Sequence, residues 1–291
     1  MFSHDKRMQY HAKPDAPDPL FAKRLQEVIG GQWGEMSVAM AYLFQGWNCR
    51  GPAKYRDMLL DIGTEEIGHV EMLATMVARL LEGAPLEALE DAVKIPMIGA
   101  ILGGNDTRDT ISAAMNPQHL IVSGLGAMPV NSVGVPWNAG YIVASGNLAA
   151  DFRFNVTAES QGRLQVARLY ALTEDKGVRD MLSFLLARDT MHQNQWIAAL
   201  AELERDGLDA TPVPMTFPQT HEMREVSYQY LDFSRGDESS QGSWASGPSP
   251  DGKGAFEYVA DPQPMGEAPE LGQVDPRLHG TPKQPVPPVA G

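Results

Sequence analysis

Two sets of acidic residues and a histidine occur in this chain with nearly the same spacing. The sets are Glu35, Glu66 and His69, and Glu159, Asp189 and His192. In each set the last acidic residue precedes the histidine by three positions, so both side chains share one face if the segment is helical. Carboxylates and imidazoles together are suitable ligands for manganese or iron ions.

Each set surrounds a segment that is typical of a turn. Residues 50–52, Arg-Gly-Pro, lie halfway between Glu35 and Glu66, and residues 173–177 lie halfway between Glu159 and Asp189. If each half is an antiparallel helix pair, both acidic groups reach the same height above their turn. Two packed pairs would bury four carboxylates and two imidazoles in one layer, which requires cations. The sequence therefore predicts a two-metal site, with Glu66 as the candidate bridge.

The apolar pattern predicts four helices to position these groups, over residues 19–47, 52–82, 138–171 and 178–204. Apolar residues recur in each at helical intervals, and the acidic residues and histidines lie on the same stripes. Tyr42 follows Glu35 along the first stripe. Gly30 and Gly31 within the first segment each cost roughly 1 kcal/mol relative to alanine, which indicates a close approach of other chain atoms.

A glutamate from each of two helices and Glu-x-x-His motifs from others form the ferritin-like two-metal pattern. We therefore predict an all-α protein with a ferritin-like four-helix bundle. A single Glu-x-x-His has a simpler explanation, a surface glutamate beside a hydrogen-bonded histidine. Two copies on apolar stripes favour the metal site. Glu65 is expected at the edge of its stripe, and Glu71 in solvent.

The domain organisation follows from composition. We expect an N-terminal arm over residues 1–18, the bundle over 19–207 and a C-terminal extension over 208–291. Residues 83–137 are rich in Gly, Pro and Asn and suit a long crossover connection. Residues 212–215 and 225–230 are expected to form short strands. The rest of the extension is too polar to order by itself and is expected to be largely irregular, wrapping neighbouring subunits.

Charge and cysteine content restrict the partners and the compartment. The net charge of −14 argues against binding to nucleic acid or anionic membrane surfaces. The sequence has no apolar run long enough for a membrane span and no signal-peptide pattern at its start. The single cysteine, Cys49, is interpreted as a small apolar filler and fits a reducing compartment, so a cytoplasmic location is expected.

The motifs resemble those of the non-haem manganese catalases over residues 1–237. The matching segments are QWGE at 32–35, Tyr42, EEIGH at 65–69, NVTAES at 155–160 and RDTMH at 188–192. The resemblance implies a dimanganese centre that disproportionates hydrogen peroxide to water and dioxygen. The two metals would cycle between a divalent and a trivalent pair. It also implies a homohexamer.

The resemblance also implies roles for individual residues. One manganese would be held by Glu35 and His69, the other by Glu159 and His192, with Glu66 as the bridge. Tyr42 would form a hydrogen bond in the outer shell near the first metal. The alternative for Tyr42, a tyrosine of the hydrophobic core, stays open.

Two positions depart from the better-known members of that family. Ala158 stands where they have arginine, and Asp189 where they have a glutamate that is thought to deprotonate peroxide. Aspartate is one methylene shorter, so Asp189 would reach peroxide only through water or leave the role unfilled. Ala158 would open access to the site or change the charge that lines it. Catalase activity is still predicted.

A second similarity concerns calcium. Some family members complete a calcium site between subunits with a segment like residues 232–236. The candidate ligands here are Asp57, Asp61, Asp232, Ser234 and Gly236. Oxygen ligands suit calcium. The alternative is two solvated aspartates and an ordinary loop.

Two other functions remain open at this stage. A di-iron oxidoreductase or ferroxidase could use the same bundle, because iron and manganese share ligands. A structural protein similar to spore-coat components could retain the assembly without the chemistry.

Overall fold

The computed structural model describes residues 4, 7–82, 122–208, 223, 226–233, 238–263 and 265. The chain forms two compact units, Met1–Thr216 and Phe217–Gly291. Most of the predicted crossover (83–121) and the expected strand at 212–215 lie outside the described residues. Within the described part, none of the helices has the length and apolarity that a membrane span needs.

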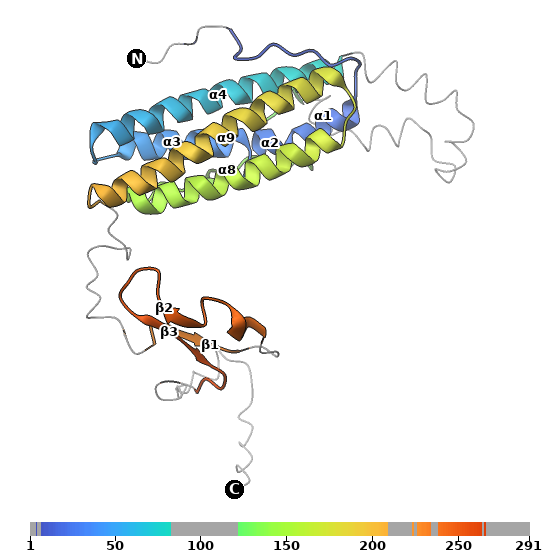
Figure 1. Ribbon diagram of the computed structural model, residues 1–291. Helices are drawn as coiled ribbons and strands as arrows, with labels where there is room; N and C mark the ends of the chain where they lie inside the picture. The colour runs from blue at the N-terminus through green and yellow to red at the C-terminus, as the bar shows by residue number, and fades with distance from the viewer. Residues whose placement is uncertain are drawn as a thin grey trace, which may run out of the picture. The chain divides into compact units, whose positions relative to one another are not determined.

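Two helical hairpins form the first unit (Figure 1). Helix α3 (Glu35–Asn48) packs against α4 (Ala53–Leu81), and α8 (Leu148–Ala171) packs against α9 (Lys176–Arg205). The N-cap residue Asp175 accepts a hydrogen bond from the backbone of Val178, which favours the start of α9 after its turn. The predicted four-helix arrangement is confirmed, and α4 and α9 begin and end within two residues of the predicted bounds.

The prediction of one continuous helix over residues 19–47 is wrong. This segment is divided into α1 (Pro19–Leu25), α2 (Glu27–Gly30) and α3. The cause is a distant segment: a Cβ on Gly30 would lie 2.5 Å from the carbonyl oxygen of Val130. The Gln26 amide also donates to the Val130 carbonyl, at 3.0 Å. The glycines therefore do mark a close approach, but the helix breaks there and restarts at Glu35.

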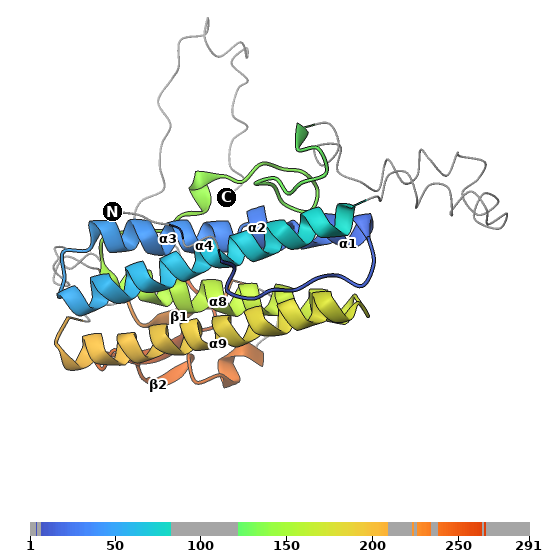
Figure 2. The same ribbon diagram turned by 90° about the horizontal axis from the view of Figure 1, so that it is seen from above.

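The third predicted helix is wrong at its start. Residues 138–147 are mostly irregular, with one short 3-10 helix, η2 (Ala139–Tyr141), and α8 begins at Leu148. Gly146 has a φ of 79°, which an α-helix cannot contain. Asn147 then caps α8 by accepting from the backbone of Ala150. Seen from above, the described residues 122–147, drawn in green, pass along α2 and α3 (Figure 2).

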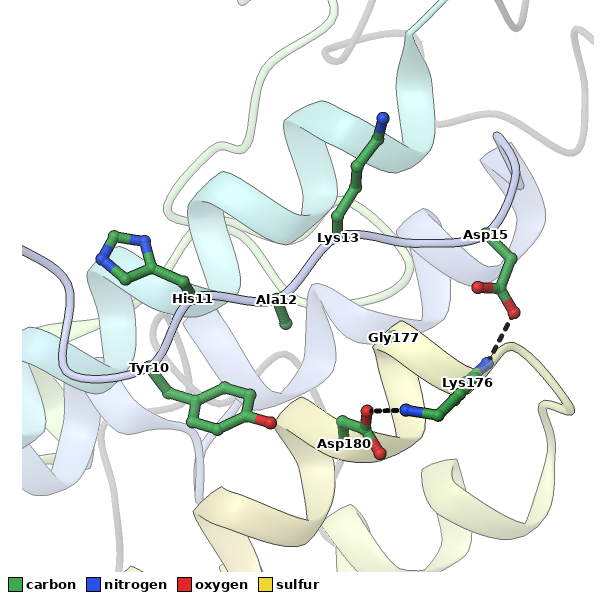
Figure 3. Close-up of a pocket in the computed structure, with 8 residues that line it drawn as sticks. All are labelled: Tyr10, His11, Ala12, Lys13, Asp15, Lys176, Gly177 and Asp180. Atoms are coloured by element: carbon green, nitrogen blue, oxygen red, sulfur yellow. Dashed lines mark hydrogen bonds and ion pairs between the residues drawn. The ribbon is translucent and has the colours of Figure 1, made fainter.

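The N-terminal arm is attached to the start of α9 (Figure 3). Asp15 accepts from the backbone N–H of Lys176 at 2.9 Å, and its own N–H donates to the Asp175 carboxylate at 2.7 Å. Tyr10 stacks on Phe184 with ring centroids 5.1 Å apart. A small surface cavity remains between the arm and the first turn of α9.

The second unit contains a three-stranded sheet. Its strands are β1 (Gln229–Leu231), β2 (Ser246–Pro248) and β3 (Ala255–Val259), in the order β1-β3-β2. Strand β1 runs parallel to β3, and β2 runs antiparallel to it. A short 3-10 helix, η4 (Glu238–Gln241), lies between β1 and β2.

Three expectations for this region are therefore corrected. The strand predicted at 225–230 is displaced to Gln229–Leu231. The segment after Gly236 was expected to be irregular, yet it supplies β2 and β3. Tyr258 donates to Asp232 at 2.6 Å and contacts Tyr230 across the sheet, so pairing between distant segments orders a polar sequence. The protein is mostly helical with a small sheet, not all-α.

Two apolar clusters fill the bundle, and the polar site lies between them. Along α4, Leu59 and Ile62 belong to one cluster and Leu73 and Met76 to the other. Along α9, residues 178–185 contribute to one cluster and residues 196–203 to the other. The acidic residues and histidines of both helices occupy the interval between these segments.

Candidate metal centre

The Glu66 carboxylate lies at the centre of the polar layer. Its Oε2 is 2.6 Å from Nδ1 of His69, and its Oε1 is 2.7 Å from Nδ1 of His192. All three side chains are buried, and the two rings stack with centroids 5.7 Å apart. One carboxylate thus contacts an imidazole from each hairpin.

Two overlapping groups of ligand atoms share Glu66. In each group the atoms lie within 4.8 Å of one another. The first group is Glu35, Glu66, His69 and Asp189, and the second is Glu66, Glu159 and His192. The structure therefore brings together the predicted residues of both hairpins, and it places Asp189 of α9 with the group from α3 and α4.

The oxygen and nitrogen atoms of this layer that could bind a metal lack hydrogen bonds. Both carboxylate oxygens of Glu66, both ring nitrogens of His69 and His192, and Oδ1 of Asp189 are buried without one in the described part of the chain. Each such group costs about 1–3 kcal/mol if it stays unsatisfied. Two cations would satisfy the Glu66 oxygens and the Nδ1 atom of each histidine. Oxygen and nitrogen donors without a thiolate fit manganese or iron.

Burial, followed by repulsion from neighbouring carboxylates, raises the pKa of Glu35, Glu159 and Asp189. Burial and the Glu66 charge raise the pKa of Glu35 to about 8. The same two causes raise the pKa of Glu159 well above its ordinary value. Burial and the Glu35 charge raise the pKa of Asp189 well above its ordinary value. A bound cation reverses this balance, because it favours the charged form of each carboxylate.

The histidines respond in the opposite sense. Burial lowers the pKa of His192, but the Glu66 carboxylate outweighs it and raises the value to about 10. The pKa of His69 is raised for the same reason. Imidazole binds a metal only when the ligating nitrogen is deprotonated, so metal binding releases protons here.

Tyr42 is in the polar layer but not where the resemblance placed it. Its hydroxyl donates to Oε1 of Glu159 at 2.6 Å, so it supports the second group and not the first. The indole N–H of Trp196 approaches the same oxygen at 3.4 Å. Tyr42 is fully buried and also packs in the apolar cluster, so the two interpretations of this residue are compatible.

Glu65 is closer to the site than its predicted place at the stripe's edge indicated. It lies 3.2 Å from Nε2 of His192 and pairs with Arg188. The contact with His192, followed by the contact with Arg188, lowers the pKa of Glu65 to about 2. Its position four residues before His69 is the sequence feature that could have identified it.

The remaining candidates have simpler surroundings. Ala158 is buried in the apolar cluster with Val38 and Trp196. The effect of this position on access to the site or on the charge that lines it stays a prediction. Asp57 and Asp61 are exposed on α4, and Asp57 pairs with Arg56.

The other calcium candidates lie after residue 231. Asp232 belongs to the second unit and accepts a hydrogen bond from Tyr258. Ser234 and Gly236 lie outside the described residues.

Comparisons with known proteins agree with this geometry. Residues 1–289 match the profile of the family described as "Manganese containing catalase". A manganese catalase of Bacillus subtilis is 61% identical over 281 residues, which cover 97% of this chain and 98% of that protein. Another, from Bacillus subtilis strain 168, is 60% identical over the same share of each chain.

A solved structure gives the same result. The crystal structure of KatB, a manganese catalase from Anabaena PCC7120, superposes with a TM-score of 0.68 and 27% identity. The match covers 90% of this chain and all of that one, and such neighbours are ferritin-like helical bundles. With two carboxylate–histidine groups sharing Glu66 and a family match along nearly the whole sequence, this chain belongs to the manganese-containing catalase family.

Proposed function

We propose that this protein disproportionates hydrogen peroxide to water and dioxygen at a pair of manganese ions. The observation that carries the proposal is the contact of one buried carboxylate, Glu66, with imidazoles from both hairpins. Glu35 and His69 would hold one ion, Glu159 and His192 the other, and Glu66 both. When bound, two adjacent manganese ions supply a two-electron redox pair without an organic cofactor.

Asp189 is our candidate for the proton-transfer group. It is buried, its Oδ1 has no hydrogen bond in the described part of the chain, and it faces the group that contains Glu35. Burial and the Glu35 charge favour its protonated form, so it can take a proton from peroxide only when cations offset that charge. It would return the proton when the second peroxide is reduced.

Tyr42 would orient the metal-binding carboxylate of Glu159 and would not take part in proton transfer. Burial and the charge of Glu159 raise the pKa of its hydroxyl well above the ordinary value. The hydroxyl therefore stays protonated and donates to Glu159 at 2.6 Å. This hydrogen bond leaves the other oxygen of Glu159 available to a metal.

The surrounding packing would keep bulk water out of the reaction. Trp196, Phe152 and Leu59 are fully buried on one side of the polar layer, and Leu73 and Leu185 on the other. A dry site strengthens the interaction of the carboxylates with cations.

The proposal extends to the assembly. A homohexamer with contacts from the C-terminal extension, and calcium bound by Asp57, Asp61 and the segment 232–236, stay predictions. Phe44 and Trp47 are exposed on α3 and contact each other, which is consistent with a subunit contact there. Light scattering before and after calcium chelation tests both parts. The long crossover and the cytoplasmic location belong to the same set of predictions.

The decisive experiment measures metal content and peroxide turnover on one sample, purified without added metal. Two manganese ions per chain, with dioxygen evolution that azide does not inhibit at levels that stop haem enzymes, are expected. Iron in place of manganese would favour the di-iron oxidoreductase. Intact assembly without dioxygen evolution would favour the structural protein.

A further inference from the structure

The two histidines turn the same ring nitrogen toward the centre of the site. Nδ1 of each faces Glu66, at 2.6 Å for His69 and 2.7 Å for His192. Nε2 of each therefore points away from Glu66. Both Nε2 atoms face one carboxylate, Glu65, at 3.8 Å for His69 and 3.2 Å for His192.

Adjacent residues of α4 thus contact opposite sides of the same two rings. Glu66 is fully buried between the Nδ1 atoms, whereas the Glu65 side chain is 26% exposed beside the Nε2 atoms. A carboxylate that accepts the second N–H of a metal-ligating histidine fixes its tautomer and its ring orientation. One carboxylate that serves two such histidines would orient both at once.

Glu65 is itself held by a residue of the other hairpin. Arg188 of α9 donates from Nε to Oε1 at 2.5 Å and from Nη2 to Oε2 at 3.2 Å. A guanidinium fork of this kind restricts both position and rotation of a carboxylate. Arg188 directly precedes Asp189, so the fork connects α4 and α9 at the level of the candidate metal centre.

We propose that Arg188 and Glu65 are positioning residues for manganese binding. Glu65 lies 3.2 Å from Nε2 of His192 and would accept its proton, and its charge at 3.8 Å would favour a proton on Nε2 of His69, which keeps the Nδ1 lone pairs directed at the metals. Arg188 holds the Glu65 carboxylate in the plane that this requires. The inference rests on the proposed metal site and adds two residues to it, neither of which touches the metals.

A purely structural salt bridge is the competing explanation. Arg188 and Glu65 are 37% and 26% exposed, and pairs of that kind contribute about 0–1 kcal/mol to stability. Such a pair would leave the affinity for manganese unchanged. Metal affinity, measured apart from turnover, therefore separates the two explanations.

The test titrates manganese(II) into the metal-free full chain and follows free ion by electron paramagnetic resonance. We expect Glu65→Gln to raise the Kd by roughly 10- to 100-fold, as loss of an outer carboxylate partner does. Arg188→Gln should raise it by about tenfold, because it acts only through Glu65. Arg188→Lys should recover part of this loss, since it restores the charge without the fork.

Matched controls come from the same two helices. Arg179→Gln removes another α9 arginine that pairs with a glutamate, Glu174, and Glu71→Gln removes another α4 carboxylate beside a histidine, His4. Both controls should keep the wild-type Kd. The double variant of Arg188 and Glu65 should bind no more weakly than Glu65→Gln alone, because the arginine has no separate route to the metals.

The outcomes separate this inference from the proposed function. Wild-type affinity in both Arg188→Gln and Glu65→Gln would overturn the positioning role while leaving the manganese site intact. A wild-type chain that binds no manganese would instead overturn the proposed function. If Glu65→Gln does not fold, the Kd values of Arg188→Gln and Arg188→Lys decide the question alone.

Discussion

The two hairpins of the bundle carry nearly the same spacing of acidic residues and histidine, yet their second acidic residues do different things. Glu66 of α4 contacts both imidazoles. Asp189, its counterpart on α9, joins the first group, and its Oδ1 has no hydrogen bond in the described part of the chain. Equal spacing along a helix therefore sets the height of a side chain but not its partner.

Side-chain length and surroundings account for the difference. Glu66 has one more methylene than Asp189 and reaches the point between the two rings. The two carboxylates also differ electrostatically, since His69 and His192 lower the pKa of Glu66 despite burial, whereas burial and Glu35 raise that of Asp189. In the proposed function, one hairpin would therefore supply the shared ligand and the other the proton-transfer group.

The strongest test of this asymmetry is Glu66→Gln. Loss of the shared carboxylate should remove both manganese ions and reduce peroxide turnover to that of protein-free buffer. The effect should exceed the roughly 10- to 100-fold cost of losing an outer partner. Metal analysis and dioxygen evolution measure it together. Two retained ions would show that Glu66 is not the shared ligand.

Asp189→Asn is the matching change in the other hairpin. It should keep two manganese ions but lower turnover by roughly 100- to 10,000-fold, the usual contribution of a general acid–base group. Asp180→Asn, which changes a partly exposed aspartate of the same helix that pairs with Lys176, serves as the control. Full activity of Asp189→Asn with intact metal would remove this residue from the mechanism and make the hairpins more alike.

Tyr42→Phe tests the second group of ligand atoms, which contains Glu159. In the manganese-loaded protein, loss of the hydrogen bond to Glu159 should lower turnover by about tenfold and stability by about 1.5–3 kcal/mol, because bound cations keep the acceptor charged. Tyr55→Phe removes a similar bond, to Asp206, in the same bundle. This control should lose stability without loss of turnover. Equal turnover in the two variants would contradict the role given to Tyr42.

The smallest expected effect is a pH dependence of the metal-free protein. Glu35 has a folded pKa of about 8 against an ordinary 4.5, so ionisation in this interval destabilises the folded state. His192 has a folded pKa of about 10 against 6.5, so its stabilisation is complete below 6.5 and is lost as pH rises toward 10. Both groups predict that the free energy of unfolding falls as pH rises from about 5 to 9.

Calorimetry of the metal-free and the manganese-loaded protein measures this dependence. The loaded protein should show the weaker dependence, because cations replace the protons. The opposite order would contradict the assignment of these groups to the metal site. The pKa values of Glu66 and Glu65 are lowered, so these groups change the free energy of unfolding only below about pH 4.5. They do not affect the comparison of metal-free and loaded protein between about pH 5 and 9.

Local spacing was sufficient to predict much of the site. Glu66 and His69 are three residues apart, as are Asp189 and His192, so each pair must share a helix face. Glu35 was assigned by its distance from the turn at residues 50–52. These predictions depend only on helix geometry and on the position of a helix-breaking segment, both of which are properties of the sequence near the residue.

Other features depended on segments far along the chain. The break after Gly30 follows from contact with Val130, and the C-terminal sheet follows from pairing of β1 with β3. The partner of Tyr42 was misassigned because hairpin packing, not spacing, brings Glu159 to its hydroxyl.

By itself, the sequence determined that two helical hairpins would present carboxylates and imidazoles at one level inside an apolar interior. It also determined the residue types, and hence the class of metal. Only the tertiary structure decided that Glu66 is shared, that Asp189 faces the opposite group and that Arg188 reaches Glu65. The physical reason is that a periodic pattern specifies which face of a helix is buried, whereas the contacts of that face depend on how the helices pack.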